Sequence, residues 1–231
     1  MGGPRGGSRR HATIPRRVPR TDDLELLERW RDGHTASGEA LFERHFESVY
    51  GFFCNKVGRD VDDLVQETFL GCVNAKDRFR AESSFRTFMF AVAHRQLLKY
   101  REKWGRARGR SAEDFEVERV HDLDRTPSQV MVEHGEQTLL LRGLRRLELD
   151  QQVLLELFYW QGLRSVDVAE ILEVPHGTVR SRLRRAREQL REVVEQLAAD
   201  PRLAESTLGD FEGWLRTLQR RRSEPQGPSQ T

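Results

Sequence analysis

The residues with the clearest capacity for chemistry are the arginines in the stretch PHGTVRSRLRRAREQL, which runs from Pro175 to Leu190. Five arginines fall within the eight positions 180–187. Arginine is permanently charged, and its planar fork of donors can bond a phosphate or a guanine edge through two hydrogen bonds at once. Positions 178–191 hold six arginines against one glutamate, so pairing along the helix cannot cancel this charge. The stretch is either an arginine-rich solvated helix or a surface that binds nucleic acid.

The elements around these arginines favour binding to DNA. The longer stretch SVDVAEILEVPHGTVRSRLRRAREQL has the pattern of a helix, a turn that contains Pro175, and a longer helix, as in a helix-turn-helix. Apolar residues recur at helical spacing in the second helix and are expected to face inward: Val179, Leu183, Ala186, Leu190 and Val193/Val194. The arginines left outside are Arg180, Arg184, Arg187 and Arg191, flanked by Arg182 and Arg185. In such a motif the start of the second helix enters the major groove of DNA.

A second group of residues, nearer the N-terminus, could bind separated nucleic-acid strands. Arg95, Lys99 and Lys103 form a basic row at a spacing of four residues, next to the polar loop 78–84. Three phenylalanines accompany this row: Phe85, Phe88 and Phe90. Basic side chains beside aromatic rings can hold a strand and stack its bases. The alternative, which helical spacing favours for Phe85 and Phe88, is that the rings belong to the core.

The elements that must position these groups are helices, because no stretch shows the alternation of apolar and polar residues that is typical of a strand. Helices are predicted over 22–31, 38–57 and 60–79, and Ser83-Ser84 offers an N-cap for a further long helix. We therefore predict an all-α fold of two small helical domains joined by a flexible linker, with a C-terminal amphipathic helix. The predicted divisions are a basic N-terminal tail over 1–21, a first domain over 22–104, a linker over 105–129, a second domain over 130–199 and a C-terminal extension over 200–231.

The C-terminal extension carries an apolar stripe that needs a partner surface. The stripe consists of Leu208, Phe211, Trp214/Leu215 and Leu218, and it ends in three arginines at 220–222. One interpretation is that the stripe packs against the second domain. The other is that it forms a regulatory element that masks a surface for DNA or for a protein partner.

Composition limits the class of protein. The chain has 231 residues, 37% of them hydrophobic, and a net charge of +2 that conceals segregated basic and acidic blocks. No run approaches the roughly 20 apolar residues of a membrane-spanning helix. The Gly-, Pro- and Arg-rich start also lacks the apolar segment of a signal peptide. We therefore expect a cytoplasmic protein that does not bind a membrane.

No catalytic residue, cofactor or small-molecule substrate is expected. The chain lacks a phosphate-cradling glycine loop and a nucleophile-elbow sequence, which speaks against an enzyme such as a nuclease. The two cysteines, Cys54 and Cys72, lie in apolar helical patterns and are expected to be reduced core thiols. Together with His45 and His94 they lack the paired spacing of metal ligands, so no metal site is predicted.

Two stretches resemble one known family when they are taken together. DDLVQETFLGCVNAKDRFRAESSFRTFMFAVAHRQLL resembles region two, and VPHGTVRSRLRRAREQL resembles the region-four recognition helix, of sigma-70 family RNA polymerase sigma factors of the extracytoplasmic-function (ECF) type. The resemblance covers about 41–104 and 144–195. It implies a factor that binds core RNA polymerase, directs it to promoters through the minus-10 and minus-35 elements, and promotes DNA opening.

The resemblance also implies roles for particular residues. In DDLVQETFL it implies contact with the clamp helices of the polymerase beta-prime subunit by Asp63, Leu64, Gln66, Glu67, Phe69 and Leu70. It implies that minus-10 DNA, including a flipped base, is bound by Arg80, Glu82, Ser83, Ser84, Arg86, His94, Arg95 and Lys99. It implies contact with minus-35 bases by Arg180, Ser181, Arg184 and Arg185, and with phosphates by Thr178, Arg182 and Arg187.

Five positions depart from the family pattern. His94-Arg95 stands where many members have Arg-Asn, and Lys99 stands where they have Asp, so the resemblance does not determine the preferred minus-10 sequence. Arg164 replaces a Ser or Thr helix cap, leaving Ser165 or Asp167 to compensate. Glu173 replaces the frequent turn glycine, at a cost of roughly 1 kcal/mol if its backbone is left-handed.

The partners implied are core RNA polymerase, through its beta-prime and beta subunits, promoter DNA and a cognate anti-sigma factor. The alternative function is a free-standing helix-turn-helix transcriptional regulator that does not bind polymerase. The stretch DDLVQETFL distinguishes the two functions, because a simple regulator would not require it.

Overall fold

The computed structural model describes residues 20–109, 111–125, 135–198 and 200–209, and within these ranges the chain is helical without any strand. The first domain is built from these described elements: α1 (Arg20–Arg31), α2 (Thr35–Cys54), α3 (Val61–Ala75), a short 3-10 turn (Lys76–Arg78) and α4 (Phe85–Arg108). No helix in the described part is long and apolar enough to cross a membrane. The predicted all-α, two-domain fold is confirmed.

The first domain packs α1, α2, α3 and α4 around an aromatic core. The largest of its fully buried apolar side chains are Phe52, Phe53, Phe85 and Phe90. Helix α4 begins where the sequence predicts, because the Ser84 hydroxyl accepts a hydrogen bond from the Thr87 backbone N–H at 3.0 Å. It continues past Trp104 and ends at Gly109, whose backbone is left-handed with φ 58°.

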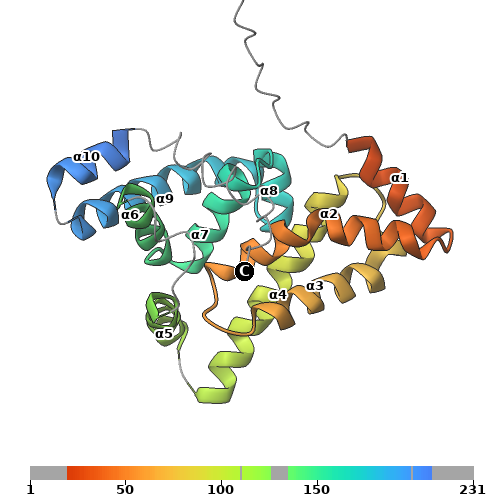
Figure 1. Ribbon diagram of the computed structural model, residues 1–231, viewed down its shortest axis with the longest axis horizontal. Coiled ribbons are helices and arrows are strands. Elements are labelled where there is room, and N and C mark those ends of the chain that lie inside the picture. The colour runs from red at the N-terminus through yellow and green to blue at the C-terminus, as the bar shows by residue number, and fades with distance from the viewer. Residues whose placement is uncertain (1–19, 110, 126–134, 199, 210–231) are drawn as a thin grey trace, which may run out of the picture.

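The second domain follows from residue 135 onward. Its described elements are α6 (Gly135–Arg145), α7 (Leu149–Leu155), a π-helical turn (Glu156–Trp160), α8 (Ser165–Ile171), α9 (His176–Leu197) and α10 (Pro201–Gly209). Gly143 lets α6 approach α9 closely, since a Cβ atom there would lie 2.8 Å from Val194 Cγ2. Helix α10 lies against α6 and α9 and buries Ala204 and Thr207 (Figure 1). The remainder of the predicted apolar stripe, from Phe211 onward, lies outside the described residues.

Helix α5 (Ala112–Arg125) lies in the range that the sequence analysis treats as a linker. Phe115 is buried and meets the Trp104 ring edge-on, with the ring centroids 5.2 Å apart. Arg119 is also buried and donates to the Leu147 carbonyl at 2.8 Å and to the Gln152 side chain at 2.9 Å. Helix α5 therefore contacts the first domain through Phe115 and the second through Arg119.

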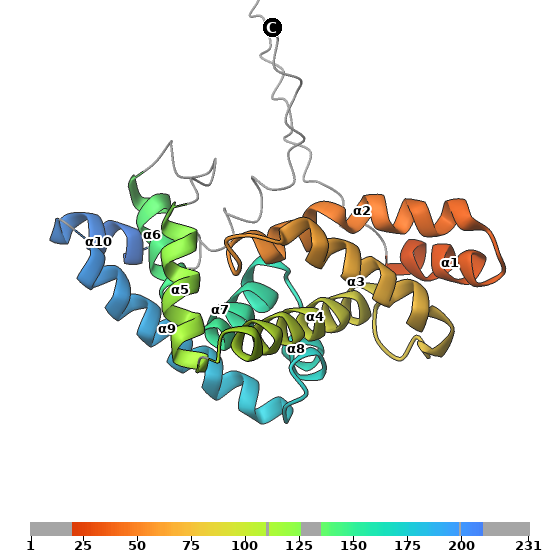
Figure 2. The same cartoon turned by 90° about the horizontal axis from the view of Figure 1, so that it is seen from below.

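The two domains lie directly against one another, with α4 of the first beside α8 of the second (Figure 2). Lys56, which follows α2, forms an ion pair with Glu156 of the π-helical turn, and both side chains are almost completely buried. Gln152 also donates to the Asn55 carbonyl at 2.6 Å. These polar contacts join residues about a hundred positions apart in the chain.

Candidate nucleic-acid interface

The helix-turn-helix consists of α8 and α9, and Pro175 lies in the turn between them, as the sequence predicts. Arg164 stands at the N-cap position without capping the helix through its side chain. Asp167, the third residue of α8, accepts the Arg164 backbone N–H at 3.2 Å and the Arg164 Nε at 2.8 Å, which ties the start of the helix together. Glu173 adopts a left-handed backbone with φ 53°. Ser165 Oγ and His176 Nε2 lie 2.8 Å apart and connect the starts of the two helices. These contacts orient α9 relative to the rest of the domain.

Helix α9 separates its apolar and basic side chains as predicted. The inward face is buried, and it consists of Val179, Leu183, Ala186, Leu190 and Val194. The exposed residues from the predicted minus-35 set are Arg180, Ser181, Arg182, Arg184 and Arg185. Arg184 and Glu188 approach only to 3.9 Å with both side chains mostly exposed, so this ion pair neutralises little of the charge.

Two members of the predicted minus-35 set are half-buried. Thr178 lies in the first turn of α9, and its carbonyl accepts a hydrogen bond from the Ser181 hydroxyl at 2.9 Å. Arg187 donates to the Tyr159 hydroxyl at 3.2 Å, so its side chain lies against the domain rather than pointing fully outward. Tyr159, which no motif of the sequence singles out, thus positions one arginine of the row.

The predicted minus-10 residues gather along α4 and the loop before it. Arg80 and Glu82 are exposed on the loop, and Ala81 between them has a left-handed backbone with φ 56°. Arg95 and Lys99 are exposed on α4. Ser84 is the helix cap described above. The loop and the helix thus bring together residues that are up to 19 positions apart in the sequence.

Three other predicted minus-10 residues contact the second domain. The Ser83 hydroxyl donates to Glu170 Oε1 at 2.9 Å, and Arg86 donates to Gln161 Oε1 at 2.6 Å. His94 Nδ1 lies 3.2 Å from the Ile171 carbonyl. Burial lowers the pKa of His94 below its usual value, against the opposing effect of the Ile171 carbonyl. At neutral pH this histidine is therefore uncharged.

The phenylalanines near this surface are mainly structural. Phe85 and Phe90 are fully buried, so they cannot stack on bases in this structure. Phe88 is half-buried and stacks on Phe79, with the ring centroids 4.6 Å apart. The interpretation of Phe85 as a core residue is confirmed.

The predicted polymerase-binding residues on α3 fall into two groups. Asp63, Gln66, Glu67 and Leu70 are exposed, and Leu70 leaves 47% of its surface open to solvent. Phe69 is half-buried against Phe42. Leu64, in contrast, is buried in the core of the domain, so its side chain supports α3 from inside and is not on the outer face.

Two further apolar residues of α2 and α3 are exposed in addition to Leu70. Phe46 on α2 is 42% exposed and Val73 on α3 is 39% exposed. Phe46 stacks on Tyr50, with the ring centroids 5.9 Å apart. Both residues lie at the edge of a helical apolar stripe, where periodicity does not separate inside from outside. We call Phe46, Leu70 and Val73 the exposed apolar patch.

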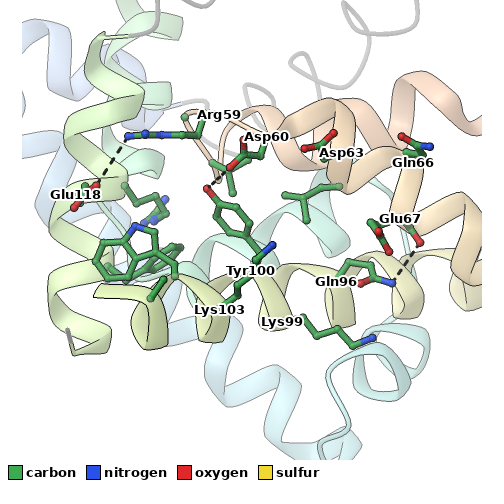
Figure 3. A pocket seen from close by; sticks show the side chains of 17 residues that line it. Arg59, Asp60, Asp63, Gln66, Glu67, Gln96, Lys99, Tyr100, Lys103 and Glu118 are labelled. Atoms are coloured by element: carbon green, nitrogen blue, oxygen red, sulfur yellow. Dashed lines mark hydrogen bonds and ion pairs between the residues drawn. The ribbon is translucent and has the colours of Figure 1, made fainter. Parts of the chain in front are cut away.

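A groove of about 640 Å³ runs between α3, α4 and α5 (Figure 3). Asp60, Asp63 and Glu67 line it from the α3 side, and Lys99 and Lys103 line it from α4. The Tyr100 hydroxyl donates to Asp60 Oδ2 at 3.3 Å across the groove. The groove therefore separates the acidic face of α3 from the basic row on α4.

The histidines and cysteines of the first domain have surroundings other than a metal site. His45 Nε2 lies 2.8 Å from Asp23, and Cys72 is buried, which raises the pKa of its thiol to about 12. In the described part of the chain, no three His, Cys, Asp or Glu side chains are grouped so that they could hold a metal ion.

Comparison with family models finds two matches along this chain. The model for Sigma-70 region 2 matches residues 41–107, and the model for Sigma-70, region 4 matches residues 137–190. The first match contains α3, the loop after it and α4 up to residue 107, and the second contains α8 and α9 up to Leu190. Both matches therefore contain the surfaces described above.

Two curated proteins are similar to this chain over most of its length. The ECF RNA polymerase sigma-E factor of Haemophilus influenzae is 31% identical over 183 residues, which are 76% of this chain and 96% of that protein. The protein of the same name from Escherichia coli K12 is 30% identical over 182 residues, covering 76% and 95%.

Two solved structures share the fold. One is the sigma factor RpoE in complex with the anti-sigma factor NepR from Bartonella quintana, with a TM-score of 0.54, 22% identity and coverage of 68% of this chain and 96% of that one. The other is CnrH in complex with the cytosolic domain of CnrY, with a TM-score of 0.54, 21% identity and coverage of 76% and 98%.

Proposed function

Since this chain belongs to the sigma-70 family of RNA polymerase sigma factors, in its extracytoplasmic-function group, we propose that separate surfaces of its two domains bind polymerase, the minus-10 element and the minus-35 element. As a sigma factor it binds core RNA polymerase and directs transcription initiation at promoters. The observation that carries the assignment is the presence of both matched regions in one chain, each with an exposed surface of suitable chemistry. A free-standing regulator would not require the first matched region, residues 41–107.

The polymerase-binding surface is the outer face of α3, extended by the exposed apolar patch. Asp63 and Glu67 supply negative charge for a basic partner, and Phe46, Leu70 and Val73 supply apolar area. Exposed apolar residues beside charged ones are typical of protein interfaces. Leu64 contributes only by supporting the helix, because it is buried.

The minus-10 surface is the loop 78–84 with the outward side of α4. Arg80, Glu82 and Arg86 are placed to hold an extruded base and its flanking phosphates, and Arg95 and Lys99 to bind the strand beyond it. Extruding a base costs a few kcal/mol, which these contacts must offset for the duplex to open. Ser84 contributes by capping α4, and Ser83 and His94 contribute once they are free of the second domain.

The minus-35 surface is the N-terminal half of α9. Arg180, Ser181, Arg184 and Arg185 are exposed where a recognition helix meets base edges. Arg182 binds phosphate, as do Thr178 and Arg187 at the margin of the surface.

The remaining assignments follow from this role. The chain has no catalysis of its own, since the chemistry of RNA synthesis belongs to the polymerase. It works in the cytoplasm, where polymerase and chromosome are found. Because similar sigma factors were solved in complex with the anti-sigma factors NepR and CnrY, a cognate anti-sigma factor is a further partner.

The polymerase-binding surface is tested by co-purification with bacterial core RNA polymerase. The double variant Phe46→Arg/Leu70→Arg should lose most of the binding, because two charges replace the apolar centre of the interface. Val117→Arg is the matched control, since Val117 is 72% exposed on α5 and outside the proposed surface. Equal binding by the double variant and the control would show that polymerase binds elsewhere.

A further inference from the structure

Helix α1 lies before the residues that the family model matches, yet its last residue contacts the start of the loop 78–84. Arg31 Nε and Nη2 donate to the Lys76 carbonyl at 2.9 Å and 2.6 Å. Nη2 also donates to the Phe79 carbonyl. These carbonyls lie 45 and 48 positions further along the chain, in and directly after the 3-10 turn that α1 packs against (Figure 2).

Helix α1 is itself held against α2 at both ends. Near its start, Asp23 accepts a hydrogen bond from Arg44 at 2.6 Å and lies 2.8 Å from His45 Nε2. Near its end, the Trp30 side chain is buried and lies so close to Gly38 that a Cβ atom there would come within 2.6 Å of the indole ring. The guanidinium that reaches the loop is therefore carried by a fixed support.

The two carbonyls that Arg31 contacts need donors from outside their own helix. They lie in the last turn of the helical segment 61–78 and on the residue after it. Carbonyl groups at the C-terminal end of a helix have no partner within that helix, and a basic side chain there is also favoured by the helix dipole. Arg31 supplies the charge and the forked donors from a different helix, so it fixes the point at which the chain leaves the segment.

Phe79, the first residue beyond that segment, is held by two helices. The Arg31 guanidinium of α1 lies over its ring, 6.0 Å from the centroid, and Phe88 of α4 stacks on it with the ring centroids 4.6 Å apart. At the other end of the loop, Ser84 caps α4. Residues 80–83 thus lie between two anchored points, and Ala81 among them has a left-handed backbone with φ 56°.

The two side chains of this loop that we assign to the extruded base depend on the anchors for their placement. Arg80 and Glu82 approach each other only to 4.0 Å, and their side chains are 81% and 79% exposed. Such an exposed pair holds neither member in place. Their positions follow instead from the backbone of the loop, and a loop that is ordered before binding loses less conformational entropy when it binds.

We propose that Arg31 is a positioning residue for minus-10 binding, which fixes the backbone of the loop 78–84 so that Arg80 and Glu82 meet the extruded base without further ordering. The proposal rests on the minus-10 assignment made above. Arg31 itself contacts the loop and not the DNA. Helix α1 thereby takes part in promoter opening, although it lies before the matched residues 41–107.

The test removes the donors of Arg31 and leaves helix α1 in place. Arg31→Met keeps an unbranched side chain of good helix propensity, which can donate to neither carbonyl. Arg29→Met is the matched control, because Arg29 is an exposed arginine in the same last turn of α1 and the change in charge is identical. Circular dichroism shows whether each variant retains the helicity of the wild type. If Arg31→Met loses helicity, Arg31→Lys takes its place, since an ammonium group keeps the charge but cannot reproduce the fork.

The readout is the affinity of the assembled holoenzyme for a non-template oligonucleotide that carries the minus-10 element of a promoter it transcribes, measured by fluorescence anisotropy. A scan of abasic sites along the oligonucleotide identifies the extruded base as the one whose loss weakens wild-type binding most. Arg31→Met should bind the intact strand about tenfold more weakly than Arg29→Met, as expected if the backbone of one loop residue must be ordered on binding. On the strand that lacks this base the two variants should bind alike, because the loop has no base to hold.

Two results would overturn the positioning role. One is equal affinity of Arg31→Met and Arg29→Met for the intact strand. The other is an equal loss of affinity by Arg31→Met on both strands, because that would place the effect in the fold of the domain rather than in the loop. Where Arg31→Lys is used instead, the same base-dependent loss is required of it, by a smaller factor.

Failure of the minus-10 assignment itself has a different signature. The double variant Arg80→Ala/Glu82→Ala removes the proposed base contacts directly. If it weakens binding of the intact strand while Arg31→Met does not, the assignment stands and the positioning role is wrong. If the double variant binds the intact strand as tightly as the wild type does, the assignment is wrong, and the inference is overturned with it.

Discussion

Single residues show how this chain tolerates departures from its family pattern. Arg164 does not cap α8 through its side chain, and the start of the helix is held instead by Asp167, which accepts from the Arg164 backbone and side chain. Glu173 adopts the left-handed backbone that the turn requires, with φ 53°, although glycine adopts it without strain. Its exposed side chain approaches Arg95 only to 3.8 Å. The strain at this turn is therefore not offset by a strong contact.

Replacing this glutamate tests the strain directly. Glu173→Gly should raise the free energy of unfolding by up to about 1 kcal/mol, because the left-handed conformation costs glycine nothing. Urea unfolding followed by circular dichroism measures the change. Glu192→Gly, at an exposed position within α9, should instead lower stability by roughly 1 kcal/mol. A destabilised Glu173→Gly would mean that the side chain does more for the turn than its contacts indicate.

At the scale of elements, the sequence predicts most accurately the helices whose pattern is strong. The inward face of α9 and the Ser84 cap of α4 follow from periodicity and from capping chemistry, which act within a few residues. Periodicity does not settle residues at the edge of a stripe. Phe46 and Val73 lie at such an edge, and both are exposed. Helix α5 is not predicted, because its acidic composition is typical of a solvated linker. Its packing depends on Phe115 and Arg119, whose partners lie in other helices.

The element with the sharpest functional prediction is α9. Arg184→Ala should weaken binding at particular minus-35 base pairs by about 1–3 kcal/mol, because a bidentate contact to a base edge is lost. Arg182→Ala should weaken binding to all sequences alike and reduce the slope of affinity against salt concentration by about one. Holoenzyme binding to minus-35 variants at several salt concentrations distinguishes the two. If both substitutions gave the same profile across sequences, the proposed orientation of α9 on DNA would be wrong.

For the whole molecule, the contact between domains could not be predicted from the sequence. Lys56 follows an ordinary apolar helix and Glu156 lies within an apolar run, and no local pattern pairs residues a hundred positions apart. The same holds for the partners of Ser83 and Arg86 on the second domain. The family resemblance supplies the roles of the surfaces, and only the three-dimensional arrangement shows that one of them is covered.

The contact of His94 with the second domain predicts a pH dependence. Burial lowers its pKa below the ordinary value of about 6.5, and Arg101 lowers it further, whereas the Ile171 carbonyl, Asp150 and Glu173 raise it. The neutral ring is therefore favoured while the domains are in contact, and that contact is weakened as the pH falls through 6.5 and below. Glu156→Lys sets two cations against each other between the domains and should separate them, so proton NMR should show a higher pKa of His94 in this variant than in the wild type. Identical titration curves would mean that the second domain does not cover this histidine in solution.

The most direct test of the central claim is run-off transcription with bacterial core RNA polymerase on genomic fragments from the source organism. With the purified chain added, discrete transcripts should appear that core polymerase alone does not make. They should be lost with Phe46→Arg/Leu70→Arg and reduced with Arg184→Ala, while Val117→Arg leaves them unchanged. If the chain bound DNA but produced no transcripts and did not associate with core polymerase, the sigma-factor account would be contradicted and a free-standing regulator would take its place.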